Sequence, residues 1–297
     1  MGYDSFYNYH PLVNFIYFSL VMVFTMFFLH PIYQGISFLA SLVYLLMNSE
    51  FKEVKNTLVF ALLVLVFSTI FNPLFSHEGI TILGYMKSGN PITLESIIFG
   101  ISTGFMFASI LMWFASYNRV MTSDKFIYLF GRILPSFSLI LSMVLRFVPL
   151  YKEKIREISN SQKLIARDMS QGNLIRKIKN GLTILSIMVT WALENAIETS
   201  DSMQSRGYGL KGRTSFSIYK FSLRDKLAIA YLACLGLVII LGSIYGLNTM
   251  KFYPRIVMAK FNMRTSLVYL AYLGLSILPI IINIQEEVKW KSIESKI

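Results

Sequence analysis

The sequence predicts an all-α polytopic membrane protein with about six transmembrane helices. Two observations support this class. The 297 residues are 55% hydrophobic and only 15% charged, with a mean hydropathy of +0.56, whereas about a quarter of the residues in soluble domains are charged. Six apolar runs of 17 or more residues are also long enough to form helices that cross a hydrocarbon core of about 30 Å.

The apolar runs follow one another with short connections in the first part of the chain. We expect spans at roughly 12–30, 32–48, 57–75, 96–116, 227–247 and 265–284. The His30-Pro31 break separates the first two. Because proline ends one helix and restarts the next, these two spans should form a hairpin with almost no loop. Neither a basic leader nor an Ala-x-Ala-like site precedes the first run, so we expect it to be retained as a span.

The basic residues of the connections indicate how the spans are oriented. The connection 48–56 carries two lysines and the connection 117–132 carries three basic residues, whereas Lys87 is the single lysine or arginine of 76–95. Positive charge accumulates on the cytoplasmic side of membranes. We therefore expect cytoplasmic termini, a four-span membrane region over 1–132, and a C-terminal membrane hairpin with a cytoplasmic tail over 227–297. The basic connection 248–264 would then lie outside, against the charge rule.

A seventh apolar run, about 133–150, begins and ends on the same side in this topology. Pro135 and Pro149 bound the run, and Arg146 places within it a charge that would be costly at a bilayer centre. We expect a helix that lies at the cytoplasmic interface or dips into it. The alternative is an ordinary span, with the topology of the N-terminal region inverted. With the polar segment that follows, this run would form a cytoplasmic region over 133–226.

The segment 151–226 is polar and helical in pattern. Its first half, from Tyr151 to Ser170, is rich in charged helix formers and is expected to end near Gly172. Its second half is expected to run from about Leu174 to Gln204, because Gly207 then supplies a C-terminal breaker. The segment therefore predicts two long cytoplasmic helices.

Several classes of function lack the residues that they require. The chain contains no Gly-x-x-x-x-Gly-Lys-Ser/Thr loop, so it should not hold a nucleoside triphosphate in the usual way. Its three histidines are scattered and Cys234 is its one cysteine, which argues against a metal site, a disulfide framework or a catalytic constellation. The formal charge of +12 suits an anionic membrane surface better than nucleic acid in so apolar a chain. We expect no cofactor, no metal and no nucleic-acid partner.

Two stripes of small residues recur at every fourth position. They are Gly100, Gly104 and Ala108 in a predicted span, and Ala192, Ala196 and Ser200 in the second polar helix. In lipid, such a stripe lets another helix approach closely. The first stripe could contact a span of the same chain or a partner membrane protein. The second indicates two long helices that cross tightly, although packing within the core would also explain it.

Two arginines lie 39 positions apart in the polar segment, Arg167 in Ala166-Arg167-Asp168 and Arg206 in Ser205-Arg206-Gly207. A guanidinium offers a rigid fork of donors that suits carboxylates, and a cation is favourably placed at a helix C-terminus. A helix that ends in arginine would thus fit an acidic groove on a soluble partner. The alternative for each arginine is a side chain that extends to the lipid headgroups.

Four motifs occur in a fixed order along the chain: Asn72-Pro73-Leu74-Phe75-Ser76-His77-Glu78-Gly79, Leu145-Arg146-Phe147-Val148-Pro149, Ala166-Arg167-Asp168 and Ser205-Arg206-Gly207-Tyr208-Gly209. Together they resemble the transmembrane T component of energy-coupling factor transporters, the CbiQ/EcfT family of vitamin and transition-metal importers. The resemblance extends from about His10 to Phe221.

The resemblance implies a scaffold between a membrane-embedded, substrate-binding S component and two cytoplasmic ATPases. It also implies two crossed cytoplasmic coupling helices, each ending in an Ala-Arg-Gly motif that engages one ATPase. By position, the ATPase-coupling residues are Ala166, Arg167, Asp168, Ser205, Arg206 and Gly207. Both arginines are kept, while Asp168 replaces the usual glycine and Ser205 the usual alanine. The Asp168 carboxylate could pair with Arg167 and compete with the ATPase.

The expected function is therefore to couple ATP hydrolysis in partner subunits to uptake of a vitamin or a transition-metal ion, in a bacterial cell membrane. The chain itself would not hydrolyse ATP. The small-residue faces and the helix 133–150 would meet the S component. A self-sufficient secondary transporter is one alternative, although the spans contain little charge that could carry ions. A membrane enzyme is another, although the chain lacks a recognisable catalytic constellation.

Overall fold

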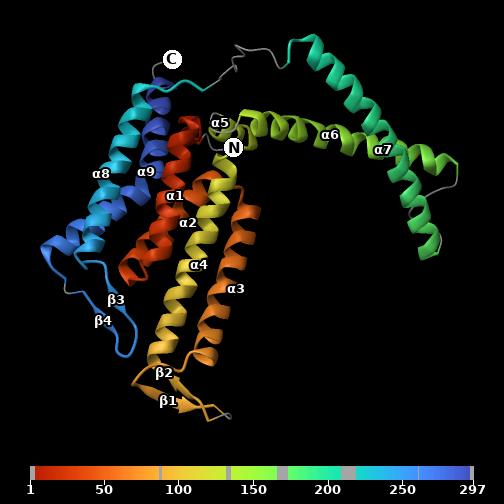
Figure 1. Ribbon diagram of the computed structural model, residues 1–297. Coiled ribbons are helices and arrows are strands. Elements are labelled where there is room, and N and C mark those ends of the chain that lie inside the picture. The colour runs from red at the N-terminus through yellow and green to blue at the C-terminus, as the bar shows by residue number, and fades with distance from the viewer. Residues whose placement is uncertain are drawn as a thin grey trace. The chain divides into compact units, whose positions relative to one another are not determined.

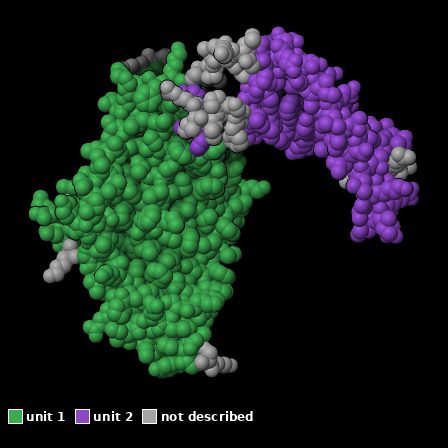
Figure 2. All heavy atoms as spheres, in the orientation of Figure 1, with its two compact units in different colours: residues 1–126, 219–297 green, residues 127–218 purple. Residues whose placement is uncertain are grey.

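The computed structural model describes residues 4–86, 89–131, 135–165, 173–208, 219–259 and 261–294. The chain divides into two compact units (Figure 2). Unit 1 comprises residues 1–126 and 219–297, and unit 2 comprises residues 127–218. Unit 2 is therefore an insertion between the two parts of unit 1. The described residues are mainly helical, which confirms the all-α class.

Unit 1 is a bundle of apolar helices (Figure 1). Its elements begin with the 3-10 turn η1 (Ser5–Asn8), and its helices are α1 (Pro11–Phe27), α2 (Pro31–Asn48), α3 (Phe51–Phe75), α4 (Leu94–Val120), α8 (Leu223–Ile244) and α9 (Met263–Glu294). Within the described ranges, α2, α3, α4, α8 and α9 are long and apolar enough to cross a membrane, and α1 is a shorter apolar helix of 17 residues. All six predicted spans are thus helices, but the first ends at Phe27 rather than at residue 30.

A proline begins each of the first two helices. Pro11 and Pro31 each stand in the first turn, where the missing N–H removes no hydrogen bond. The preceding residues, His10 and His30, accept through Nδ1 from the N–H two residues later, at 3.2 and 3.3 Å. The connection between α1 and α2 is thereby limited to residues 28–30, as the His30-Pro31 break predicts.

Polar and aromatic side chains join α1, α2, α4 and α9 at the centre of unit 1. Thr25 Oγ1 lies 2.8 Å from Ser37 Oγ and 2.9 Å from the Tyr272 hydroxyl. Trp113 Nε1 donates to Ser37 Oγ at 3.0 Å. All four residues are buried. Such interhelical hydrogen bonds hold helices together in lipid, where the hydrophobic effect between them is weak. The last helix is therefore part of the same core as the first two.

The small-residue stripe of the fourth predicted span lies on α4, and its two glycines face α3. A Cβ added at Gly104 would lie 3.0 Å from the Leu65 carbonyl oxygen, and one added at Gly100 would lie 3.1 Å from the Ser68 carbonyl oxygen. Ala108 is buried. The two glycines thus let the backbones of α3 and α4 approach each other within this chain.

Two short β-hairpins connect spans at one end of unit 1 (Figure 1), and the sequence did not predict them. The antiparallel strands β1 (Ile82–Tyr85) and β2 (Pro91–Thr93) lie between α3 and α4. The antiparallel strands β3 (Met250–Lys251) and β4 (Val257–Met258) lie between α8 and α9. These strands have only two to four residues, too few to produce a recognisable alternating pattern.

The carboxylate of Glu95 organises the connection that contains β1 and β2. Glu95 is buried and accepts from the Thr81 N–H at 3.3 Å and from the Thr81 hydroxyl at 2.9 Å. Gly79, the last residue of the motif that begins at Asn72, has a φ of +136°. A Cβ at Gly79 would lie 2.6 Å from Glu95 Oε2. Both the backbone conformation and the close carboxylate therefore require glycine there.

Unit 2 contains two long helices, α6 (Pro135–Leu164) and α7 (Leu174–Ser205), and the short helix α5 (Ser123–Gly131) extends into it from unit 1. The prediction that the helix over 133–150 ends near Pro149 is wrong, because α6 continues through this proline. Its position at the cytoplasmic interface stays a prediction. The ring of Phe147 stacks on that of Tyr151, with centroids 5.7 Å apart. This contact bridges the turn that contains the proline, and the charged helix formers beyond it extend the helix.

Candidate functional site

The helices α6 and α7 pack against each other through a small apolar cluster. Ile158 of α6 is buried together with Ile184 and Met188 of α7. The rings of Tyr151 and Trp191 meet edge to face, with centroids 5.6 Å apart and planes at 78°. An aromatic pair of this geometry adds about 0.5–1.5 kcal/mol to the stabilisation from apolar burial. Unit 2 thus has a core of its own, made by two crossing helices.

A cation lies beside this aromatic pair. The ammonium of Lys154 is 2.9 Å from Glu157 Oε2 and 5.6 Å from the centre of the Trp191 ring. The ion pair lies within one helix and its carboxylate is well exposed, so its contribution to stability is small. The Lys154 ammonium lies over the indole ring and thereby helps to hold Trp191 against α6.

The predicted small-residue stripe of α7 does not lie at the centre of this contact. Ala192 is half-buried, while Ala196 and Ser200 are exposed. The contact with α6 lies earlier on α7, from Ile184 to Trp191. Large apolar side chains make this contact, and the apolar area that they bury stabilises the packing of the two helices.

A second apolar stripe on α7 faces away from α6. It consists of Ile175, Ile178, Leu182, Leu185 and Val189, whose exposed fractions are 78%, 55%, 60%, 57% and 49%. The spacing of three and four residues places these side chains on one face of the helix. At 100° per residue, that face differs from the one that carries Ile184 and Met188. We call these five residues the α7 stripe. An exposed apolar stripe of this kind is typical of a surface that binds another protein.

The C-terminal end of α7 is fixed by a Schellman motif. The N–H of Tyr208 donates to the Met203 carbonyl at 3.0 Å, and the N–H of Gly207 donates to the Gln204 carbonyl at 2.9 Å. Gly207 has a φ of +79°, a conformation that glycine adopts without strain. Arg206 is the last residue before this glycine, and its side chain is exposed.

Ser205, Arg206 and Gly207 thus stand at a defined helix end, where their motif was expected. Within the described ranges, no ion pair involves Arg206. An exposed guanidinium at a helix C-terminus is positioned to meet an acidic partner. The other predicted coupling residues, Ala166, Arg167 and Asp168, lie outside the described residues. Their role therefore stays a prediction, and the structure does not place the two arginines relative to each other.

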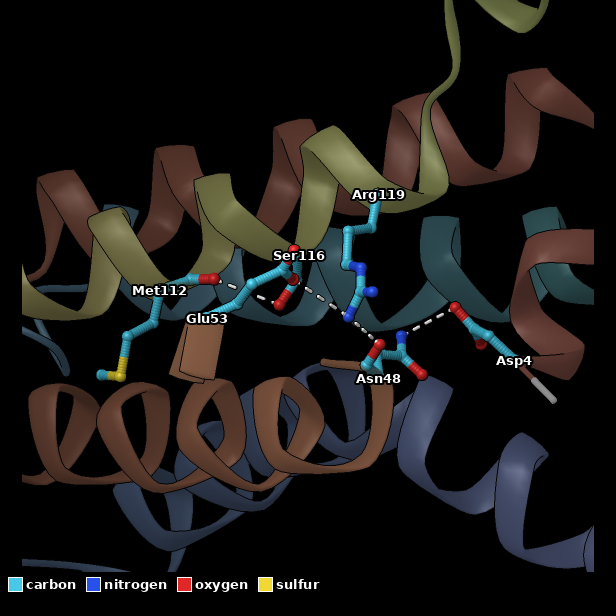
Figure 3. Close-up of polar contacts among 6 residues, drawn as sticks. All are labelled: Asp4, Asn48, Glu53, Met112, Ser116 and Arg119. Atoms are coloured by element: carbon cyan, nitrogen blue, oxygen red, sulfur yellow. Dashed lines mark hydrogen bonds and ion pairs between the residues drawn. The ribbon is translucent and has the colours of Figure 1, made fainter. Parts of the chain in front are cut away.

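A polar cluster occupies the end of unit 1 at which the chain leaves for unit 2 after Phe126 and returns at Tyr219. Arg119 of α4 donates to the Asn48 carbonyl and lies 3.4 Å from Glu53 Oε2 (Figure 3). The Asn48 amide donates to Asp4 Oδ2 at 2.7 Å. These contacts join the N-terminal segment to the ends of α2, α3 and α4.

Asp4 also connects this cluster to the last helix. The Tyr44 hydroxyl donates to Asp4 Oδ2 at 3.0 Å, and the Asn283 amide donates to Asp4 Oδ1 at 3.0 Å. Asn283 Oδ1 in turn accepts from the Phe6 N–H at 3.2 Å. A single carboxylate therefore holds α2 and α9 around the N-terminal turn.

Lys125 is the buried cation of this cluster. It is 1% exposed, donates to the Tyr7 carbonyl and to the Val120 carbonyl, the latter at 3.1 Å, and lies 3.6 Å from the centre of the Tyr7 ring. Burial lowers the pKa of Lys125 from 10.5 to about 8, although the charge of Asp4 acts in the opposite direction. The lysine ties the start of α5, through which the chain enters unit 2, to the N-terminal turn.

Sequence reasoning did not predict that Asp4, Lys125 and Arg119 belong to one polar cluster. Asp4 precedes the first span, and Arg119 and Lys125 belong to the basic connection 117–132. Their partners are backbone carbonyls or residues far away in the sequence. One usable signal was present. Lys125 and Arg119 stand close to the ends of an apolar run, where charge has to find a partner at the membrane surface.

The burial of Lys125 predicts a pH effect on stability. Between about pH 8 and pH 10.5 the folded lysine is neutral while the unfolded one still holds a proton, so the free energy of unfolding rises with pH. In detergent, the unfolding temperature of the wild type relative to Lys125→Met should therefore increase from pH 7.5 to pH 9.5. A difference that stays flat or falls over this range contradicts the assigned burial.

The known proteins that resemble this chain are membrane components of transporters. Residues 8–218 match the family model CbiQ, described as cobalt transport protein. The chain is 37% identical over 105 residues to the energy-coupling factor transporter transmembrane protein EcfT of Lactobacillus helveticus, covering 35% of this chain and 38% of the relative. It is 27% identical over 193 residues to EcfT of Streptococcus thermophilus, covering 59% and 70%. It is 35% identical over 106 residues to EcfT of Lactococcus lactis, covering 35% and 40%.

The matches cover only some of the helices described above. The alignments with the Lactobacillus and Lactococcus proteins span about two fifths of the length of each relative. The family match includes α1 to α7, and it ends before α8 and α9. Both units of the chain therefore contribute to the matched segment, whereas the C-terminal pair of helices lies beyond it.

Proposed function

This chain belongs to the CbiQ family of transporter membrane components, and from that membership we propose that it couples ATP hydrolysis in two partner ATPases to import through an S component. In this proposal the chain is the membrane scaffold of an energy-coupling factor importer, and the cargo is a vitamin or a transition-metal ion. The regions 1–132 and 227–297 would lie in the bilayer, and 133–226 would lie at the membrane interface and in the cytoplasm, where both termini would also lie.

The observation that carries the proposal is the construction of α7. One face of this helix packs on α6, a second face presents the exposed α7 stripe, and its C-terminal end presents Arg206 on a rigid cap. These are three separate surfaces on one helix, suited to a crossing partner, an apolar partner and an acidic partner. A helix built in this way can transmit a displacement of its end to whatever covers its stripe.

In mechanical terms, the ATPases would act on the helix ends. Closure of the two ATPases on ATP would draw together the ends that carry Arg167 and Arg206. The contact of Tyr151 and Ile158 with α7 would make the two helices move as a pair. The resulting rotation or shift of α7 would then move the membrane subunit that is bound to the α7 stripe.

The apolar character of the stripe identifies the partner that fits it. Each of its side chains would lose exposed apolar area on binding, which is worth about 1.5–3 kcal/mol for full burial of a leucine or isoleucine. A helix of a membrane-embedded S component supplies a matching apolar surface. The acidic groove required by Arg206 is instead expected on the ATPases.

The test is to purify the tagged chain in mild detergent together with its co-expressed partners. Leu182→Asn with Leu185→Asn should reduce the amount of bound membrane subunit by about tenfold or more, because two buried leucines are lost. The ATPases should stay bound. Thr190→Asn, which places the same side chain at an exposed position of α7 outside the stripe, should retain all subunits.

Two results would oppose the proposal. If the double variant keeps its membrane subunit at the wild-type level, the stripe is not the docking surface. If the purified chain alone transports substrate into liposomes without any ATPase, it is a secondary transporter instead.

A further inference from the structure

The connection between α8 and α9 carries an unusual charge pattern. The segment 248–264 contains four basic residues and no acidic one. Three of the basic residues are described and exposed: Lys251, Arg255 and Arg264. Within the described ranges, no ion pair involves any of the three. This charge lies at the end of unit 1 that is remote from the Asp4 and Lys125 cluster, so it is not explained by the entry into unit 2.

The hairpin of β3 and β4 is held rigidly against the bundle. Phe252 is 5% exposed and its ring meets that of Phe99 on α4, with centroids 5.1 Å apart. Ser76 Oγ donates to the Tyr253 hydroxyl at 3.1 Å. At the start of the segment, the buried Asn248 accepts from the Tyr33 hydroxyl at 2.7 Å. The position of the hairpin is therefore set by the bundle.

The contact with Phe99 sets the depth of the hairpin in the membrane. The residues of α4 between Glu95 and Arg119 are uncharged, and at 1.5 Å per residue they rise about 35 Å, close to the thickness of the hydrocarbon core. Phe99 lies about 6 Å from Glu95 along the helix. The Phe252 contact is therefore close to one end of the uncharged stretch of α4, which places the hairpin near a membrane surface.

Apolar and basic side chains alternate on the exposed surface of this hairpin. Lys251 and Val257 are directly opposite each other on β3 and β4, so they point to the same face. Val257, Met258 and Phe261 are 59%, 49% and 75% exposed. Exposed apolar side chains interleaved with basic ones are typical of segments that insert into an anionic membrane surface.

We propose that the β3–β4 hairpin and the first turn of α9 bind anionic phospholipid headgroups. Val257, Met258 and Phe261 enter the acyl boundary, and Lys251, Arg255 and Arg264 contact the headgroup phosphates above it. The binding keeps positive charge at this membrane surface despite the tendency of basic residues to accumulate on the other side. This proposal does not depend on the transport function proposed above.

The experiment places a fluorescent label on the hairpin of the full chain. Val257→Cys in a Cys234→Ser background is labelled and reconstituted into nanodiscs of phosphatidylglycerol and phosphatidylcholine, with bromine on one lipid or the other. Brominated phosphatidylglycerol should quench the label at least about twofold more strongly than brominated phosphatidylcholine, because several basic residues attract the same anionic surface. Raising the salt to about 0.5 M should reduce this preference.

The charge variants identify the residues responsible. Lys251→Gln, Arg255→Gln and Arg264→Gln together should abolish the preference, whereas Lys289→Gln with Lys291→Gln, at the far end of α9, should leave it unchanged. Equal quenching by the two lipids, or none by either, overturns the proposal, as does a preference that survives the triple substitution. If the triple variant fails to insert, the lipid preference of the labelled chain and its salt dependence decide the question.

Discussion

Arg206→Ala is expected to reduce ATP-dependent uptake by tenfold to about a hundredfold. In the proposed transporter, the exposed guanidinium at the end of α7 meets a carboxylate of one ATPase, and a charged hydrogen bond of this kind is worth about 1.5–3 kcal/mol. The Schellman motif at Gly207 fixes the backbone of the helix end that carries the arginine. Arg206→Lys should restore only part of the uptake, because lysine keeps the charge but not the fork.

The measurement combines uptake of labelled vitamins and transition-metal ions with recovery of the ATPases on the tagged chain. Arg176→Ala, at an exposed arginine in the first turns of the same helix, is the matched control and should behave as the wild type. Arg167→Ala tests the first motif, and the double variant with Arg206→Ala should abolish uptake. Normal uptake by the double variant contradicts the coupling role of both arginines.

Gly104→Ile is expected to destabilise the membrane bundle by about 3 kcal/mol, the upper end of the usual cost of overpacking. The space that a side chain at Gly104 would need is occupied by the backbone of α3, since an added Cβ lies 3.0 Å from the carbonyl oxygen and 3.1 Å from the Cα of Leu65. Unlike a flexible side chain, a helix backbone cannot move aside locally. The two helices would have to separate, which also breaks the contact of Ser68 Oγ with Thr103 Oγ1, now 2.9 Å long.

The unfolding temperature in detergent reports this effect. Gly35→Ile is the control, because Gly35 is an exposed position of α2 where an added Cβ meets nothing within 4 Å. Gly104→Ala should fall between the two, since a single methyl group requires a displacement of only a few tenths of an ångström. If Gly104→Ile and Gly35→Ile lower the unfolding temperature equally, the glycines of α4 are not needed for the close approach of α3 and α4.

The sequence was sufficient to predict the helices of the membrane unit, because long apolar runs and helix-starting prolines are local signals. Pro31 is an example: the residue that marks the break also begins α2. Pro149 is the opposite case. The same residue type inside α6 does not end the helix, because Phe147 and Tyr151 pack across it. That contact pairs two turns of one helix and depends further on Trp191 of another, so a local pattern cannot reveal it.

The candidate site was predictable to the same extent. The end of α7 at Arg206 followed from the glycine at Gly207, a local signal for a helix terminus. The crossing of α6 and α7 was expected from small residues such as Ala196, but it is made by Ile184, Met188 and Trp191. The sequence contains both patterns on different faces of one helix, and only the position of the second helix decides which face is used.

The bonds between α9 and the first helices have a consequence for biogenesis. Thr25 meets the Tyr272 hydroxyl, Tyr17 donates to the Ser276 carbonyl, and the Asn283 amide donates to Asp4. While the ribosome is still synthesising unit 2, the earliest helices have already entered the membrane with these polar groups lacking their final partners. The polar core of the bundle is therefore completed only when the last helix has been inserted, and we expect a chain truncated before α9 to be less stable in the membrane.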